Sequence, residues 1–252
     1  MNTIDTILNI AEEFQHEIDA LWKDDKFSEI EVIKRGYGVH AEIIKNAILF
    51  VGINPSFTKN SEIDNYFIKI HQDGTSVKTY ADGTFSEREK PYSYFKKFVE
   101  IIAKLKGSTD FKDLKWMHVD LLFHRETEQK LISVLKKDKK TPNGAAFIYG
   151  QFEIAKKIIA KSEPKVIVVS NSKARDFLKN KEGKNNLGFD FKFDSKLGTE
   201  TIVNHPTLEG VPVFFTSMLT GQRALDLGSY ERLIWHIKYV LEKRYSFENE
   251  LS

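Results

Sequence analysis

The chain contains no cysteine. This absence excludes disulfides, thiolate nucleophiles, cysteine-ligated zinc and iron–sulfur clusters. An excess of charge of one sign is also missing, because 38 Lys and Arg residues face 36 Asp and Glu residues, for a formal net charge of +2. A nearly neutral chain can still carry a local basic face, so net charge neither requires nor rules out a nucleic-acid partner.

Long apolar runs and several catalytic signatures are missing as well. Apolar runs such as residues 47–51 and 166–169 are far too short to span a bilayer. The N-terminal segment carries acidic residues early and lacks the basic segment followed by an apolar one that is typical of a secretion signal. We therefore expect no secretion signal, no membrane partner and a cytoplasmic location. Neither Gly-x-Ser-x-Gly, a P-loop nor Gly-x-Gly-x-x-Gly occurs, which disfavours serine hydrolases and nucleotide-phosphate sites.

Two histidines of the second apolar segment, His118 and His124, lie six residues apart without a carboxylate pattern typical of a metal site. We interpret them as packing or strand-edge residues. The sequence therefore predicts no metal and no cofactor.

Apolar periodicity predicts alternating strands and helices. Asn171 or Ser172 is expected to cap the helix that follows the strand at 164–170. Between residues 57 and 90 the chain is polar, with turn signals at Asp73-Gly74 and Asp82-Gly83, and is expected to form a long loop. Strands are expected at 47–51, 116–123, 164–170, 199–204 and 211–216, and helices at 3–22, 91–105, 150–162, 173–178 and 230–241.

This alternation indicates an α/β fold in which a mainly parallel sheet is covered on both faces. We predict a three-layer α/β/α sandwich formed by a single domain over residues 1–252, on which an N-terminal helix within residues 1–25 packs. We expect the chain to be a monomer.

The sharpest local signal follows the first apolar strand, where Gly52, Ile53, Asn54, Pro55 and Ser56 force a turn. In open α/β sheets, ligands bind in the loops that leave the carboxyl ends of strands. A glycine lets the backbone approach a ligand closely, and a proline holds the turn rigid. The segment is therefore a candidate binding loop.

Three segments, in this order, resemble the uracil-DNA glycosylase superfamily. Residues 52–56, Gly-Ile-Asn-Pro-Ser, are similar to the first motif of the mismatch-specific and single-strand-selective branches, Gly-(Ile/Met)-Asn-Pro-Gly. Residues 120–125, Asp-Leu-Leu-Phe-His-Arg, occupy the place of a family strand of the form Asn-Val-Val-Lys-Cys-Arg. Residues 163–174, Glu-Pro-Lys-Val-Ile-Val-Val-Ser-Asn-Ser-Lys-Ala, look like the helix–strand–helix segment written Pro-Lys-Val-Ile-Val-Ala-Leu-Gly-x-x-Ala.

The resemblance implies hydrolysis of a base–sugar bond in DNA, through an oxocarbenium-like transition state and a water aimed at the sugar. Asn54 matches the family residue that positions this water. Backbone amides around Ile53 and Asn54 would then contact the substrate, together with Gly52, Pro55 and Ser56. An aromatic side chain stacks on the flipped base in the family. Tyr94, Phe95 or an aromatic of the 57–90 segment could do so here.

Two departures from the family pattern keep a second function open. The family's second motif carries a His-Pro-Ser or Asn-Pro-Ser, whereas residues 217–223 read Ser-Met-Leu-Thr-Gly-Gln-Arg. In this loop Ser217 is a possible substrate contact, Leu219 a possible wedge in the base stack, Gln222 a possible donor and Arg223 a possible phosphate contact. Losing a stabiliser of the leaving base costs about 10²–10³ in rate.

Asp120 is the second departure, since the family reads the base with an asparagine amide at this strand. An ionised carboxylate only accepts hydrogen bonds, which suits a donor-rich base edge better than uracil, unless Asp120 is protonated. The sequence therefore supports two hypotheses: a DNA glycosylase, and a non-catalytic protein that binds a nucleotide or nucleic acid on the same fold.

Overall fold

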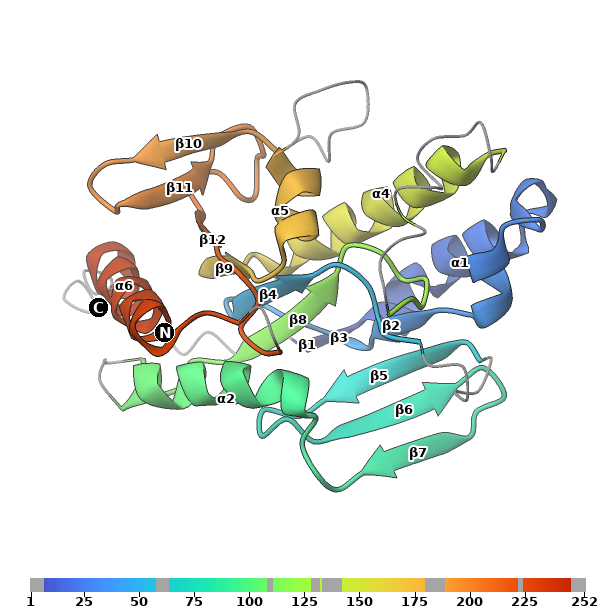
Figure 1. The fold of residues 1–252 in the computed structure, drawn as a ribbon, viewed down its shortest axis with the longest axis horizontal. Helices are drawn as coiled ribbons and strands as arrows, with labels where there is room; N and C mark the ends of the chain where they lie inside the picture. The colour runs from blue at the N-terminus through green and yellow to red at the C-terminus, as the bar shows by residue number, and fades with distance from the viewer. Residues whose placement is uncertain are drawn as a thin grey trace.

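The computed structural model describes residues 7–57, 64–107, 111–127, 132, 142–179, 189–221 and 224–245. Its largest sheet has six strands in the order β10-β11-β12-β9-β4-β8 (Figure 1). The strands are β4 (Ile48–Gly52), β8 (Trp116–Asp120), β9 (Val166–Val169), β10 (Phe191–Asp194), β11 (Thr199–Ile202) and β12 (Pro212–Phe215).

The inner part of this sheet is parallel, and its strand order places a crevice at β4. Strand β4 pairs in parallel with β8 on one side and β9 on the other, and β9 pairs in parallel with β12. Strands β11 and β10 extend the sheet antiparallel. The strand that follows β4 in this sheet, β8, lies on one side of β4, whereas the next strand, β9, lies on the other side. The direction in which strands are added to the sheet therefore reverses between β4 and β9. Ligands bind at such a switch point in open α/β sheets.

Helices cover both faces of the sheet, because the buried strands are apolar on both sides. On β4, Leu49 and Val51 belong to the core cluster shared with α1, α4 and α5, whereas Ile48 and Phe50 belong to the cluster shared with α2 and α6. The Phe50 ring stacks on Phe98 of α2 with 4.2 Å between centroids. The helices are α1 (Ile10–Lys23), α2 (Ser93–Lys106), α4 (Gly144–Ser162), α5 (Ser172–Lys179) and α6 (Leu227–Tyr245).

A second sheet corrects the expectation of a long loop between residues 57 and 90. It has four strands in the order β2 (Gly38–His40), β5 (Tyr66–Ile70), β6 (Ser76–Tyr80) and β7 (Phe85–Arg88), and it lies below the main sheet in Figure 1. The predicted turns are real, but they connect hairpins. The side chain of Asp73 accepts a hydrogen bond from the Thr75 amide, and Gly74 has a left-handed φ of 87°. Charged residues on the exposed strands hid the β pattern.

The other predicted elements hold with shifted ends. The first helix begins only at Ile10, because residues 7–9 form β1 (Ile7–Asn9), which pairs with β3 (Glu42–Ile44). Helix α4 starts at Gly144 rather than at residue 150, and β10 was not predicted. Strand β8 ends at Asp120, so this carboxylate terminates the strand instead of interrupting it. Two short 3-10 helices, Asp25–Phe27 and Glu31–Arg35, connect α1 to β2.

Within the described ranges, no helix combines the length and the apolar character that crossing a membrane requires.

Candidate functional site

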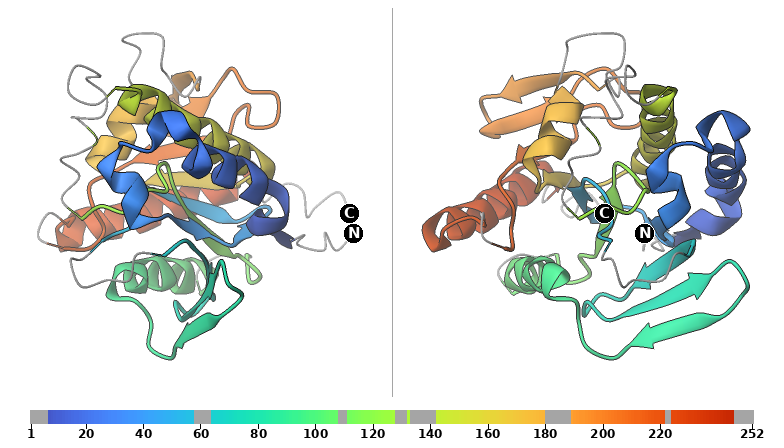
Figure 2. Two further views of the ribbon diagram at one scale, coloured as in Figure 1. Left: turned by 90° about the vertical axis from the view of Figure 1, so that its right-hand side faces the viewer. Right: turned by 45° about the vertical axis from the view of Figure 1, so that its right-hand side comes forward.

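A cavity of about 380 Å³ lies at the carboxyl ends of the parallel strands. The loops after β4, β9 and β12 and the last residue of β8 line one side, and strands β2, β5 and β6 of the second sheet contribute the other. The two further views in Figure 2 show the second sheet and α2 packed beneath the main sheet. The volume falls in the range typical of small-molecule sites.

The side chain of Asn54 is held in one orientation beside this cavity. Its Nδ2 donates to the carbonyl oxygens of Pro55 and Glu126, at 2.9 and 2.5 Å. The Glu126 amide in turn donates to the Pro55 carbonyl at 2.9 Å, which ties the loop after β4 to the loop after β8. The Oδ1 of Asn54 is buried and has no partner among the described residues. A ligand or water that donates a hydrogen would satisfy it.

Asp120 stands directly beside the end of β4. Gly52 is its register partner in the parallel pair β4–β8. A Cβ at position 52 would lie 2.3 Å from Asp120 Oδ1 and 2.8 Å from His118 Nε2. Position 52 therefore requires glycine, because any side chain would occupy the space of the Asp120 carboxylate and the His118 ring.

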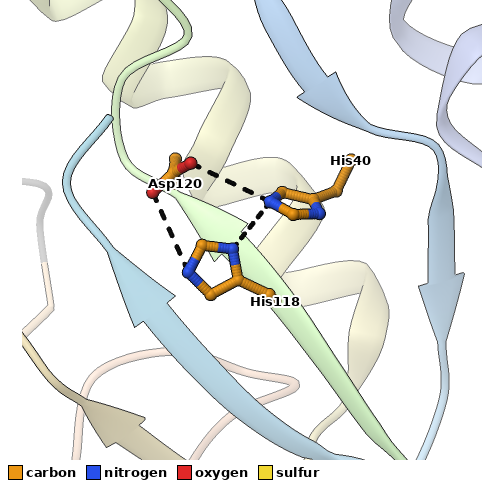
Figure 3. Close-up of side chains that lie close together, drawn as sticks. All are labelled: His40, His118 and Asp120. Atoms are coloured by element: carbon orange, nitrogen blue, oxygen red, sulfur yellow. Dashed lines mark hydrogen bonds and ion pairs between the residues drawn. The ribbon is translucent and has the colours of Figure 1, made fainter. Parts of the chain in front are cut away.

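Two histidines complete this corner of the cavity (Figure 3). His118 Nδ1 lies 2.7 Å from His40 Nε2. Asp120 Oδ2 is 3.8 Å from His40 Nε2, and Asp120 Oδ1 is 3.9 Å from His118 Nε2. His40 ends β2 and reaches the cluster from the second sheet. The cluster thus combines two imidazoles and one carboxylate, of which His40 comes from the second sheet and His118 and Asp120 come from β8 of the main sheet.

Burial controls the charge of His118. It lowers the pKa of His118 to about 3; the nearby Asp120 carboxylate raises it in part and His40 lowers it further. The imidazole is therefore neutral at pH 7, with one ring nitrogen able to accept a hydrogen bond or bind a cation.

Aromatic side chains form much of the remaining wall. Tyr66, Tyr92, Tyr94 and Phe95 line the cavity. Burial raises the pKa of the Tyr94 phenol, and the Asp120 carboxylate adds to this effect, so the hydroxyl stays protonated. Tyr94 Oη lies 3.4 Å from His118 Nε2.

Two cations contact the face of one of these rings. Lys78 Nζ lies 4.5 Å and the Arg125 guanidinium 5.2 Å from the centre of the Tyr66 ring. Such a wall suits a flat, π-rich ligand.

Five of the ten predicted site residues line this cavity. Asn54 and Asp120 line it, together with Ile53, Pro55 and Ser56. Gly52 is not part of the lining, but it lies directly against Asp120.

The loop after β12 differs from its prediction. Among the described residues of this loop, Met218 lines the cavity, whereas Ser217 is exposed outside the lining. The wedge role expected of Leu219 does not fit its position, because its apolar side chain is buried in the core shared with α2 and α6. Gln222 and Arg223 lie outside the described residues.

No pattern in the sequence predicted that residues of the second sheet line the cavity. His40 is 78 residues from its partner His118, so no local spacing connects the two. Asn171 was expected only to cap a helix, yet it also lines the cavity, as does Ser170. His118 and His124, which we considered together, lie apart: His124 is fully buried against Gln151 of α4.

The sequence predicted no metal, yet three side chains of the cavity could serve as metal ligands. His40, His118 and Asp120 each offer a ligand atom, and these atoms lie within 4.8 Å of one another.

Comparison of the chain with known protein families, curated proteins and solved structures found no match. The resemblance to uracil-DNA glycosylases therefore depends on the sequence motifs alone.

Proposed function

We propose that this chain is a DNA glycosylase that hydrolyses the bond between a damaged or mispaired base and its sugar, on a three-layer α/β/α fold like that of uracil-DNA glycosylases. The observation that carries the proposal is the convergence of Asn54 and Asp120 on one aromatic-walled cavity. The cavity also lies at the switch point of the sheet, where α/β enzymes bind their ligands.

Asn54 orients the attacking water in this mechanism. Both hydrogens of its amide are engaged by carbonyl oxygens, so Oδ1 is the atom left to accept a hydrogen from water. The water oxygen bonds to C1′ and gives up one proton, and the base leaves with the electron pair of the C–N bond and takes up one proton, so that one water is consumed in all. A fixed acceptor lowers the entropic cost of this step, because the water is already aimed.

Asp120 and the aromatic wall recognise the base. The carboxylate accepts hydrogen bonds from amino or ring N–H groups, and an aromatic ring of the wall stacks on the base plane. This set of groups favours a base edge rich in donors, such as a guanine-like or amino-pyrimidine base, over uracil.

The second candidate function, non-catalytic binding of a nucleotide or nucleic acid, is favoured by the loop after β12. In its described part, residues 217–221, the cavity receives Met218 and no histidine. An apolar thioether does not stabilise the negative charge of a departing base as a histidine does.

The test is base release from oligonucleotides that carry uracil, hypoxanthine, xanthine or a mismatch, followed by cleavage at the abasic site. We expect release from at least one substrate and a loss of about 10²-fold or more in Asn54→Ala, the loss typical when a reacting group is no longer held in position. Asn9→Ala is the matched control, because Asn9 is exposed on β1, outside the cavity lining. It should retain wild-type activity.

Binding without release from any of these bases would reject the glycosylase and support the binder. Equal activity of Asn54→Ala and wild type would remove Asn54 from the mechanism. Circular dichroism and thermal melting of both variants separate a catalytic loss from a failure to fold.

A further inference from the structure

The cluster of His40, His118 and Asp120 has the donor chemistry of a metal site. Two imidazoles and one carboxylate belong to the ligand types that bind zinc and other first-row transition metals. All-oxygen ligand sets are typical of Ca²⁺ and Mg²⁺, so the two nitrogens disfavour those ions.

The donor atoms lie close enough for small side-chain shifts to bring them into one coordination sphere, since they are within 4.8 Å of one another. Metal–ligand bonds of about 2.0–2.2 Å at tetrahedral angles place neighbouring ligand atoms about 3.3 to 3.6 Å apart. His40 Nε2 lies 2.7 Å from His118 Nδ1 and 3.8 Å from Asp120 Oδ2, values on either side of that range. When both rings are neutral, a single hydrogen can lie between His118 Nδ1 and His40 Nε2. A bound ion would replace this hydrogen.

The surroundings fix the position of the carboxylate and orient one of the histidines. Gly52 presents no side chain to the cluster, whereas a Cβ there would collide with Asp120 Oδ1. With Nδ1 of His118 as the ligand atom, its Nε2 faces Tyr94 Oη at 3.4 Å. Metal-bound histidines commonly use their second nitrogen for such an orienting hydrogen bond.

The donor atoms belong to residues that line the 380 Å³ cavity. Three protein ligands leave at least one coordination position for water or substrate, as open catalytic sites do, whereas purely structural zinc sites are closed by four.

We propose that His40 Nε2, His118 Nδ1 and Asp120 Oδ2 bind one divalent transition-metal ion, with zinc as the reference ion and its open positions toward the cavity. The proposal does not depend on the glycosylase proposal, because it concerns binding of the ion and no reaction step.

The test is calorimetric titration of Zn²⁺ into the full chain after removal of metal with a chelator and gel filtration. We expect one ion per chain. Affinity should fall at least about 100-fold in His40→Ala, His118→Gln and Asp120→Asn, and about 10-fold in Tyr94→Phe, since outer-shell partners typically contribute 10- to 100-fold. His16→Ala and Asp113→Asn, which change exposed residues outside the cluster, are the matched controls and should bind as wild type.

Co²⁺ provides a second readout, which reports the coordination of the ion directly. Its visible d–d absorption reports coordination by nitrogen and oxygen ligands, and the band should be lost in His40→Ala. His40 is only partly buried, so this variant is the one most apt to fold if His118→Gln does not.

Zinc binding that persists unchanged in His40→Ala and Asp120→Asn, or no binding by folded wild type, would overturn the proposal and leave the cluster as a hydrogen-bonded triad. Base release is measured separately, with and without chelator. Failure to release any base leaves the metal result standing, and failure to bind zinc leaves the glycosylase result standing.

Discussion

At the scale of single residues, Gly52 controls how closely two strands can bring their functional groups together. Its register partner Asp120 places a carboxylate oxygen where a Cβ at position 52 would be, 2.3 Å away. The same Cβ would lie 2.8 Å from His118 Nε2. The Asp120 carboxylate and the His118 ring can therefore occupy this corner of the cavity only because residue 52 lacks a side chain.

Gly52→Ala should consequently damage the site and the fold together. Overpacking a filled interior typically costs about 1–3 kcal/mol, so we expect the free energy of unfolding in urea to fall by this amount. Activity and zinc affinity should fall too, because the Asp120 carboxylate and the His118 ring must move.

Gly107→Ala is the matched control for this experiment. Among the described residues, the atoms nearest to a Cβ at position 107 would be carbonyl oxygens at 3.5 and 3.9 Å, which are ordinary contact distances. Its stability should stay within about 0.5 kcal/mol of wild type. Two glycine variants with the same stability would contradict the packing argument.

At the scale of secondary structure, the site depends on where strands end and helices begin. Helix α5 starts immediately after β9, and Asn171 lies between them. Asn171 Oδ1 accepts hydrogen bonds from the amides of Lys173 and Ala174, at 2.9 and 3.2 Å. These amides have no carbonyl partner within the helix, so the side chain caps it.

Because Asn171 both caps α5 and lines the cavity, two substitutions should separate these roles. Asn171→Ala removes the cap and should lower the free energy of unfolding by about 0.5–2 kcal/mol. Asn171→Ser keeps a capping oxygen, so its free energy of unfolding should stay close to that of wild type. It changes the cavity wall at the same position as Asn171→Ala does. Urea denaturation of both variants is the measurement, and equal stability of the Ala and Ser variants would argue against the cap.

At the scale of the whole molecule, the cavity lies between two sheets of different character. The parallel strands contribute the loops at their carboxyl ends, whereas the second sheet contributes His40, Tyr66 and the partly exposed Lys78. A nucleic acid that delivers a base to this cavity has to pass its backbone near the second sheet, where Lys78 is available for a phosphate.

The glycosylase proposal therefore predicts a strong dependence of affinity on salt. Each phosphate contact contributes a slope of about −0.9 on duplex and −0.7 on single-stranded DNA in a plot of log K against log salt concentration. Lys78→Ala should reduce the slope by about one such contact, as measured by fluorescence anisotropy with a labelled oligonucleotide. Lys192→Ala, on the exposed face of β10, is the control and should leave the slope unchanged.

An unchanged slope in Lys78→Ala would exclude this lysine from phosphate binding. A flat salt dependence of the wild type would argue against a nucleic-acid partner altogether, because a free base or nucleoside carries no phosphate charge.

Much of the fold could be predicted because its signals are local. The run at residues 47–51 is apolar on both faces, which is typical of a parallel strand covered by helices, and β4 has this character. The turn residues Asp73-Gly74 were recognised from their own chemistry. The strands on either side were not, since their exposed faces carry charged residues such as Lys69 and Lys78 and show little apolar alternation.

By itself the sequence determined the buried strand, the rigid Gly-Ile-Asn-Pro-Ser turn at its end and the absence of every cysteine-based chemistry. These conclusions depend on neighbouring residues and on composition. Only the tertiary structure decided that His40 joins His118 and Asp120, because the second sheet brings this histidine across 78 residues of chain. The tertiary structure likewise decided that Leu219 packs in the core, since burial depends on which elements pack against a loop and not on the loop's own residues.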